Sequence, residues 1–125
     1  MSKILIVDDA SEITSMIQSM LENHGHKVAG VAHDGLEAIE KYKALRPDVV
    51  LMDILMPGMD GMQSIRRILE YDKEAKIVVV TALGRPDLMK ELVKVGVVGY
   101  VTKPFEIKRL LNAIEVAAAP PWKKP

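Results

Sequence analysis

Short apolar runs alternate along the chain with longer segments in which apolar residues recur at every third or fourth position. A run of about four to eight residues, rich in Val and Ile, predicts a β-strand. Five such runs are present: Lys3–Val7, Lys27–Ala32, Val49–Met52, Ile77–Val80 and Val97–Val101. The first, third and fourth are apolar almost throughout, which is typical of strands buried on both faces. We therefore expect these three to be the central strands of a sheet.

A segment with the period of an amphipathic helix follows each run. Gly25, Pro47 and Gly96 mark the ends of the first, second and fourth of these helices. The last helix is the clearest, and its apolar face comprises Ile107, Leu110, Leu111, Ile114 and Ala118. Strands that alternate with helices predict a parallel sheet, so the pattern indicates an α/β domain of five βα units, (βα)5.

Composition sets the size of the fold. The chain has 125 residues, of which 49% are hydrophobic and 27% are charged. This is the balance of a globular protein, and the length leaves no room for a second module. We expect residues 1–119 to form one domain and residues 120–125 to form a loose tail or a linker stub.

Charge and targeting signals exclude several functions. The 17 basic and 17 acidic side chains cancel and the basic ones are scattered, so direct nucleic-acid binding is not expected. The chain has no cysteine, which excludes disulfides and thiolate metal sites. It shows no secretory signal, and no apolar stretch approaches the roughly 20 residues that a membrane-spanning helix needs. We expect a cytoplasmic protein without membrane insertion.

Charged residues, and one threonine, follow closely after four of the predicted strands. Asp8 and Asp9 follow the first, Asp53 follows the third, Thr81 follows the fourth, and Lys103 follows the fifth across one threonine. In a parallel sheet the carboxyl ends of the strands form one edge, where ligands bind. These five residues are therefore expected to share one site.

The three carboxylates indicate the chemistry of that site. Crowded carboxylates repel one another and need a cation, and Mg²⁺ binds to one or two carboxylates together with phosphate oxygens. A carboxylate can also attack phosphorus and form an acyl phosphate. Asp53, central in the sheet, is the expected nucleophile, while Lys103 and Thr81 supply the charge and the hydroxyl that phosphoryl transfer requires.

These residues resemble the receiver domain of bacterial and archaeal two-component response regulators, over Lys3 to Ala118. The segment Asp53–Gly61, DILMPGMDG, matches the D-x-x-M-P-x-M-x-G signature of that family. The other residues that carry the resemblance are Asp8-Asp9, Thr81-Ala82, Tyr100 and Lys103-Pro104-Phe105. The resemblance implies a flavodoxin-like, doubly wound sheet of order 2-1-3-4-5. This order is already known for flavodoxin and for a chemotaxis regulator.

The resemblance also implies roles for individual residues. Asp53 would accept a phosphoryl group from a histidine kinase or a phosphotransfer protein. Mg²⁺, with Mn²⁺ as an alternative, would bind to Asp8, Asp9, Asp53 and the backbone carbonyl of Leu55. The Lys103–Pro104 peptide bond would be cis, and Thr81 and Tyr100 would form a coupled switch.

The resemblance further implies a signalling protein that catalyses only its own phosphorylation and dephosphorylation. Such a protein acts on a target that recognises the phosphorylated form, as a monomer or a phosphorylation-linked dimer. We expect a stand-alone regulator of the chemotaxis or phosphorelay type; a receiver cut from a longer transcriptional or enzymatic regulator is the alternative.

Two groups of mainly apolar residues bear on the lifetime of the phosphoryl group and on the output surface. Leu55 and Leu83 stand where fast-cycling members often carry polar side chains, so we predict slow autodephosphorylation. A second group, Met89, Val93, Val98 and Tyr100, forms either an exposed output face or ordinary core packing.

Rival interpretations remain for individual motifs. Asp9 has capping-box spacing to Glu12 and on its own fits a helix cap. An aspartyl-phosphate phosphatase of the haloacid dehalogenase type needs an acid where this chain has Leu55, and a flavodoxin needs a phosphate-binding loop where Asp8 and Asp9 would repel phosphate. The three histidines, His24, His26 and His33, are interpreted as surface residues.

Overall fold

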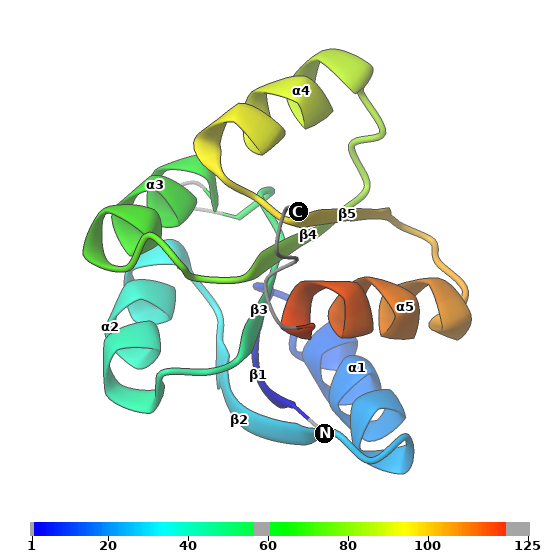
Figure 1. The fold of residues 1–125 in the computed structure, drawn as a ribbon. Coiled ribbons are helices and arrows are strands. Elements are labelled where there is room, and N and C mark those ends of the chain that lie inside the picture. The colour runs from blue at the N-terminus through cyan, green and yellow to red at the C-terminus, as the bar shows by residue number, and fades with distance from the viewer. Residues whose placement is uncertain (1, 57–60, 120–125) are drawn as a thin grey trace, which may run out of the picture.

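The computed structural model describes residues 2–56 and 61–119, which form one sheet flanked by helices (Figure 1). The strands are β1 (Lys3–Val7), β2 (Lys27–Ala32), β3 (Val49–Met52), β4 (Ile77–Thr81) and β5 (Gly99–Thr102). The helices are α1 (Ser11–Asn23), α2 (Gly35–Leu45), α3 (Gly61–Tyr71), α4 (Pro86–Val95) and α5 (Ile107–Ala118). All strand pairs are parallel, in the order β2-β1-β3-β4-β5, so the expected fold class, (βα)5 topology and strand order are confirmed.

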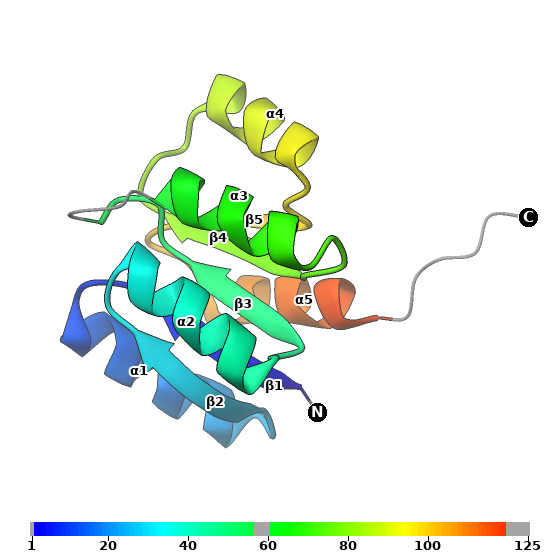
Figure 2. The same ribbon diagram turned by 90° about the vertical axis from the view of Figure 1, so that its left-hand side faces the viewer.

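The helices cover both faces of the sheet. Successive side chains of a strand point to opposite faces, so they pack alternately against one helical layer and the other. Leu5, Val50 and Val79 face the layer made by α2, α3 and α4. Ile6 and Leu51, which alternate with them, face α1 and α5. Figure 2 shows α2 and α3 side by side in front of the sheet. Strands β1, β3 and β4 are buried along nearly their whole length, as their apolar runs predict.

Strand β5 differs from the predicted Val97–Val101. The N–H groups of Gly96 and Val97 both donate to the carbonyl of Leu92, so Val97 closes the last turn of α4 instead of opening the strand. At the other end, the ladder continues to Thr102. Val97 is apolar because it is buried beneath α4, which a strand pattern cannot distinguish from strand burial.

Two details of the helices also correct the expectations. The cap of α1 is Ala10, with no side-chain hydrogen bond, so the capping interpretation of Asp9 is wrong. At the end of α5, the buried residue is Ala117 and not the predicted Ala118, which is exposed, whereas Leu110 and Ile114 are buried as predicted. Within residues 2–56 and 61–119, none of the helices has the length and apolar character needed to cross a bilayer.

Candidate functional site

The strand ends bring the predicted site residues together at one edge of the sheet. Asp53 follows β3 directly, and its N–H donates to the carbonyl of Val7 at 2.9 Å. Lys103 follows β5, and its N–H donates to the carbonyl of Thr81 at 2.8 Å. The parallel ladder thus runs one residue past each strand, which holds the functional side chains on backbone that is itself hydrogen-bonded.

The carboxylates of Asp8, Asp9 and Asp53 each offer an oxygen within 4.8 Å of the others. Asp8 and Asp53 are buried, with exposed fractions of 3% and 6%, whereas Asp9 is exposed. One oxygen of each buried carboxylate accepts a backbone N–H at 2.9 Å, from Ala10 for Asp8 and from Leu55 for Asp53. These bonds fix both carboxylates and leave their second oxygens directed at the site.

Lys103 bridges the two buried carboxylates. Its Nζ donates to Asp8 Oδ2 at 2.6 Å and to Asp53 Oδ2 at 3.2 Å. Burial by itself lowers the pKa of Lys103, but the hydrogen bond to Asp8 and the charge of Asp53 outweigh it, so the pKa is raised. Lys103 is therefore a permanent cation at neutral pH, and the Lys103–Pro104 peptide bond beside it is cis.

This set of groups suits a hard divalent cation and a phosphoryl group. Three carboxylates and one ammonium leave an excess of negative charge, which favours a bound cation. The donor atoms are all oxygen and are held by the ends of β1 and β3, as Mg²⁺ requires. The residues present therefore fit Mg²⁺, and Asp53 can act as a nucleophile beside it.

Thr81, Leu83 and Tyr100 form a second cluster next to the carboxylates. Thr81 is completely buried at the end of β4, and its Oγ1 accepts the N–H of Leu83 at 3.4 Å. The Tyr100 hydroxyl donates to the carbonyl of Leu83. Burial raises the pKa of Tyr100, so the hydroxyl keeps its proton at neutral pH. The loop after β4 is thus tied to both Thr81 and Tyr100.

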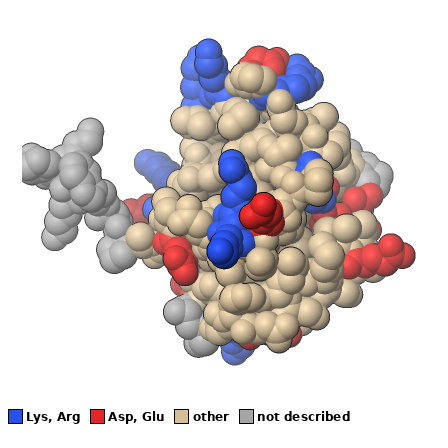
Figure 3. Space-filling view, turned by 90° about the vertical axis from the view of Figure 1, so that its right-hand side faces the viewer, with Lys and Arg blue, Asp and Glu red and all other residues tan. Residues whose placement is uncertain are grey.

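The apolar residues of interest lie at the surface. Leu55 is 49% exposed, while Met89, Val93 and Val98 are 38%, 68% and 42% exposed. Core packing is therefore the wrong interpretation for the last three. Figure 3 shows the side of the molecule on which α4, β5 and α5 lie, where a largely uncharged area separates charged residues over α4 from a charged group in the middle of the view.

Two residues near the site have contacts that the sequence does not indicate. His33 and His24 are exposed and His26 is half-buried, but the Nδ1 of His33 lies 3.0 Å from the carbonyl oxygen of Asp8. Gly61 is packed against the backbone of Asp53 and Ile54. The signature glycine is visible in the sequence, whereas His33 carries no local signal.

Residues 57–60 of the signature and the predicted tail, residues 120–125, lie outside the described residues.

Comparison with known proteins matches this geometry to one family. Residues 4–115 match the model of the response regulator receiver domain. Chemotaxis protein CheY of Treponema pallidum is 42% identical over 114 residues, which cover 90% of this chain and 79% of that protein. CheY of Thermotoga maritima is 42% identical over 112 residues, which cover 90% and 93%. A solved CheX–CheY–BeF3–Mg²⁺ complex from Borrelia burgdorferi matches with a TM-score of 0.91 at 31% identity, covering 94% of this chain and 90% of that one.

Proposed function

This chain belongs to the response regulator receiver domain family, whose members are signalling phosphoacceptors, and we propose that Asp53 accepts a phosphoryl group from a histidine kinase or a phosphotransfer protein. The observation that carries this proposal is the position of the Asp53 carboxylate. It is buried, lies beside two other acids, and has its two oxygens held by Lys103 and by the Leu55 N–H.

The chemistry follows from those contacts. An Asp53 oxygen forms a bond to phosphorus as the bond to the leaving group breaks, which yields an acyl phosphate. Mg²⁺, when bound to Asp8, Asp9, Asp53 and the carbonyl of Leu55, neutralises the charge of the phosphoryl oxygens. The Lys103 ammonium supplies the second positive charge, and it is already placed against Asp53 at 3.2 Å. The chain catalyses only the formation and hydrolysis of its own acyl phosphate.

Thr81 and Tyr100 couple phosphorylation of Asp53 to a conformational change. The new phosphoryl oxygens accept a hydrogen bond from the Thr81 hydroxyl, which withdraws Oγ1 from the Leu83 N–H. Because the Tyr100 hydroxyl is bonded to the carbonyl of Leu83, a shift of this loop alters the position of the Tyr100 ring. Only such a differential contact can change the balance of two conformations.

The proposed output face comprises Met89, Val93, Val98 and Tyr100. Met89, Val93 and Val98 are exposed there, from α4 and the segment before β5, and they offer an apolar surface to a protein target. The similarity to CheY proteins supports a chemotaxis-type pathway for this target.

Intact-mass measurement after incubation with a small phosphodonor, such as acetyl phosphate, and Mg²⁺ tests the proposal. We expect a mass gain of one phosphoryl group, which chelation of the metal and Asp53→Asn both abolish. Asp87→Asn is a matched control, because Asp87 is an exposed acid on α4 that pairs with Arg85. A mass gain that persists in Asp53→Asn would contradict the assignment.

A further inference from the structure

The ring of His33 reaches from the end of β2 to the end of β1. Its Nδ1 lies 3.0 Å from the carbonyl oxygen of Asp8. A carbonyl oxygen can only accept a hydrogen bond, so Nδ1 carries the proton and donates. Although His33 is exposed as a residue, this hydrogen bond is partly buried.

A bulge in β2 creates this contact. Lys3 and Ile4 pair with Lys27 and Val28, but Leu5 pairs with Gly30, so one residue of β2 is extra. The shift persists to the strand end, where Val7 pairs with Ala32 and the next residues are Asp8 and His33. Without the bulge, Asp8 would stand beside Ala32, which has no donor on its side chain.

The N-terminus of α2 fixes the backbone of His33. Asp34 caps this helix by accepting the N–H of Glu37 at 2.8 Å. Glu37 Oε1 in turn accepts the N–H of His33 at 2.6 Å. This arrangement resembles a capping box that has been extended by one residue, and it anchors His33 before its ring crosses to β1.

The carbonyl of Asp8 belongs to the peptide group that joins Asp8 to Asp9. A bond to this oxygen therefore fixes the plane from which the Asp9 side chain departs. Asp9 is exposed and is one of the three clustered carboxylates, whereas Asp8 is already held by the N–H of Ala10 and by Lys103. Of the two acids, Asp9 is thus the one whose orientation depends more on its backbone.

We propose that His33 is a positioning residue that orients the Asp8–Asp9 peptide group, and with it the Asp9 carboxylate, for binding of a divalent cation. This inference rests on the proposed function, in which Asp8 and Asp9 bind Mg²⁺. It extends the site to β2, the one strand of the described sheet whose end carries no other proposed site residue.

Two substitutions separate the hydrogen bond from the bulk of the ring. In His33→Asn, the side-chain amide can place an N–H near the position of Nδ1, so the bond to the Asp8 carbonyl is retained. In His33→Leu, the bond is lost but a side chain of similar size remains. The matched control is His24→Leu, because His24 Nδ1 also lies beside a backbone carbonyl, that of Met20, at the remote end of α1.

The measurements are the Mg²⁺ dissociation constant by calorimetry and the ¹⁵N shift of the Asp9 amide in metal-free protein. We expect His33→Leu to weaken Mg²⁺ binding about 3- to 10-fold, the effect of one hydrogen bond, and to move the Asp9 resonance. His33→Asn restores both values most of the way, and His24→Leu changes neither. Thermal denaturation of each variant checks that the fold is intact.

The outcomes distinguish this inference from the proposed function. If wild-type protein binds Mg²⁺ and is phosphorylated, but His33→Leu has the wild-type affinity and Asp9 shift, the role of His33 is wrong and the proposed function stands. Equal losses in His33→Leu and His33→Asn also contradict the hydrogen-bond mechanism. If wild-type protein neither binds Mg²⁺ nor gains a phosphoryl group, the proposed function itself fails.

Discussion

At the scale of single residues, Gly61 shows how closely α3 approaches the backbone of Asp53 and Ile54, directly after β3. A Cβ atom at this position would lie 2.3 Å from the Cα of Ile54 and 2.8 Å from the carbonyl oxygen of Asp53. Both are backbone atoms, which cannot rotate away as a side chain can. The absence of a side chain at Gly61 therefore determines where Asp53 stands.

Gly61→Ala is expected to displace the Asp53–Ile54 backbone and to destabilise the fold. Overpacking of this kind costs about 1–3 kcal/mol, which urea denaturation measures. The control is Gly84→Ala, where the nearest atom, Thr102 Cγ2, is 3.4 Å from the added Cβ. The control should stay within about 0.5 kcal/mol of wild type. Equal stability of Gly61→Ala and wild type would contradict the close approach.

Leu55 and Leu83 set the expected lifetime of the acyl phosphate. Leu55 is exposed and Leu83 is half-buried, and neither side chain can hydrogen-bond a water aligned for attack on phosphorus. We predict that Leu55→Asn combined with Leu83→Glu accelerates dephosphorylation at least about tenfold, because a polar side chain can orient the attacking water. The decay of the phosphorylated mass over time measures the rate. A decay no faster than that of wild type would show that the two leucines do not limit hydrolysis.

Residue-level prediction succeeded where chemistry depends on strand ends and failed where it depends on register. Asp8, Asp53 and Lys103 lie far apart in the sequence, yet each follows an apolar run, which was sufficient to place them together. The contact of His33 with Asp8 requires the bulge in β2. No residue type in Lys27–Ala32 indicates that this strand contains a bulge. The sequence therefore indicates only a surface histidine at position 33.

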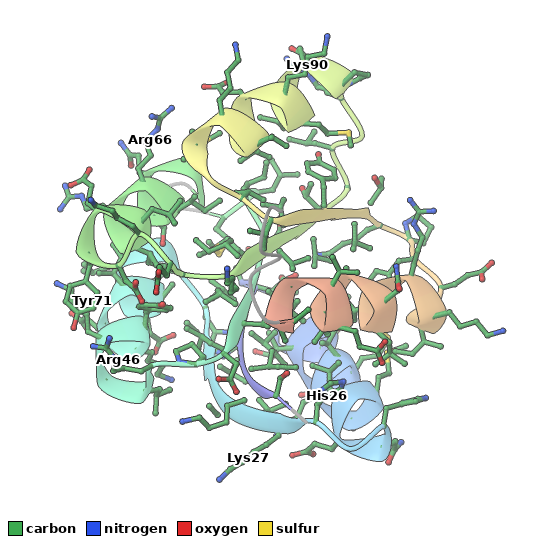
Figure 4. The ribbon with its side chains drawn as sticks, in the orientation of Figure 1. His26, Lys27, Arg46, Arg66, Tyr71 and Lys90 are labelled. Atoms are coloured by element: carbon green, nitrogen blue, oxygen red, sulfur yellow. The ribbon has the colours of Figure 1, made fainter. Side chains whose placement is uncertain are left out.

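At the scale of elements, a hydrogen bond joins the C-terminal ends of α2 and α3. The hydroxyl of Tyr42 donates to Asp72 Oδ2 at 2.7 Å, and the Tyr42 ring meets that of Tyr71 edge to face at 6.4 Å between centroids. Figure 4 labels Tyr71 and Arg46 at this end of the helix pair, where an Arg46 nitrogen lies 3.4 Å from the Tyr71 hydroxyl. The contact lies at the opposite edge of the sheet from Asp53.

The Tyr42–Asp72 bond makes stability depend on pH in a defined direction. The hydrogen bond from Tyr42 lowers the pKa of Asp72 below its unfolded value. Its stabilisation is therefore present above the unfolded pKa of about 3.9 and is lost as the pH falls through the lower folded pKa. Burial, together with Asp72, raises the pKa of Tyr42, so stability also falls as the pH rises above the unfolded value of about 10.

Tyr42→Phe should remove this hydrogen bond and the pH dependence that comes from it. We expect a loss of about 1 kcal/mol near pH 7, because water replaces the hydroxyl at the partly exposed carboxylate. Thermal denaturation between pH 3 and pH 7 should show a smaller dependence on pH than in wild type. Tyr71→Phe is the control and should retain the wild-type slope. An unchanged slope in Tyr42→Phe would contradict the assigned role of Asp72.

The boundaries of most helices and strands agree with the hydrophobic pattern. The exceptions are positions where the pattern does not show which contact buries an apolar residue. The bounds of β1, β2 and β3 agree with the predicted runs. In β5, Val97 is buried by the end of α4 and not by strand pairing, which the apolar pattern could not separate. On α5, Ala117 and Ala118 are chemically identical, so the sequence could not choose which of them faces the sheet.

At the scale of the whole molecule, the clustered carboxylates lie at the carboxyl ends of the strands, and the surface proposed for output lies on α4 and the segment before β5. α1 and α5 cover one face and α2, α3 and α4 cover the other, so the site lies at the open edge between the layers (Figure 1). Within the described residues of α4, only Leu92 is fully buried, while Met89 and Val93 are exposed. A helix with so little buried surface is a suitable element to shift when Thr81 and Tyr100 change position.

The fold class could be predicted from the hydrophobic pattern, but the strand order could not. The alternation of strands and helices was sufficient for an α/β fold with β1, β3 and β4 at the centre. The order β2-β1-β3-β4-β5 came from the family resemblance, because apolar patterns do not state which buried strands are neighbours. The exposure of Met89, Val93 and Val98 required coordinates, since the same apolar residues on α4 and before β5 would also suit core positions.

The central claim is that Asp53 becomes an acyl phosphate, and chemical trapping of that bond tests it most directly. Borohydride reduces an aspartyl phosphate to homoserine, which peptide mass spectrometry locates to a single position. After treatment with acetyl phosphate and Mg²⁺, we predict homoserine at position 53, and none when the metal is chelated. Homoserine at another aspartate, or a phosphorylated protein that yields no homoserine, would contradict the account.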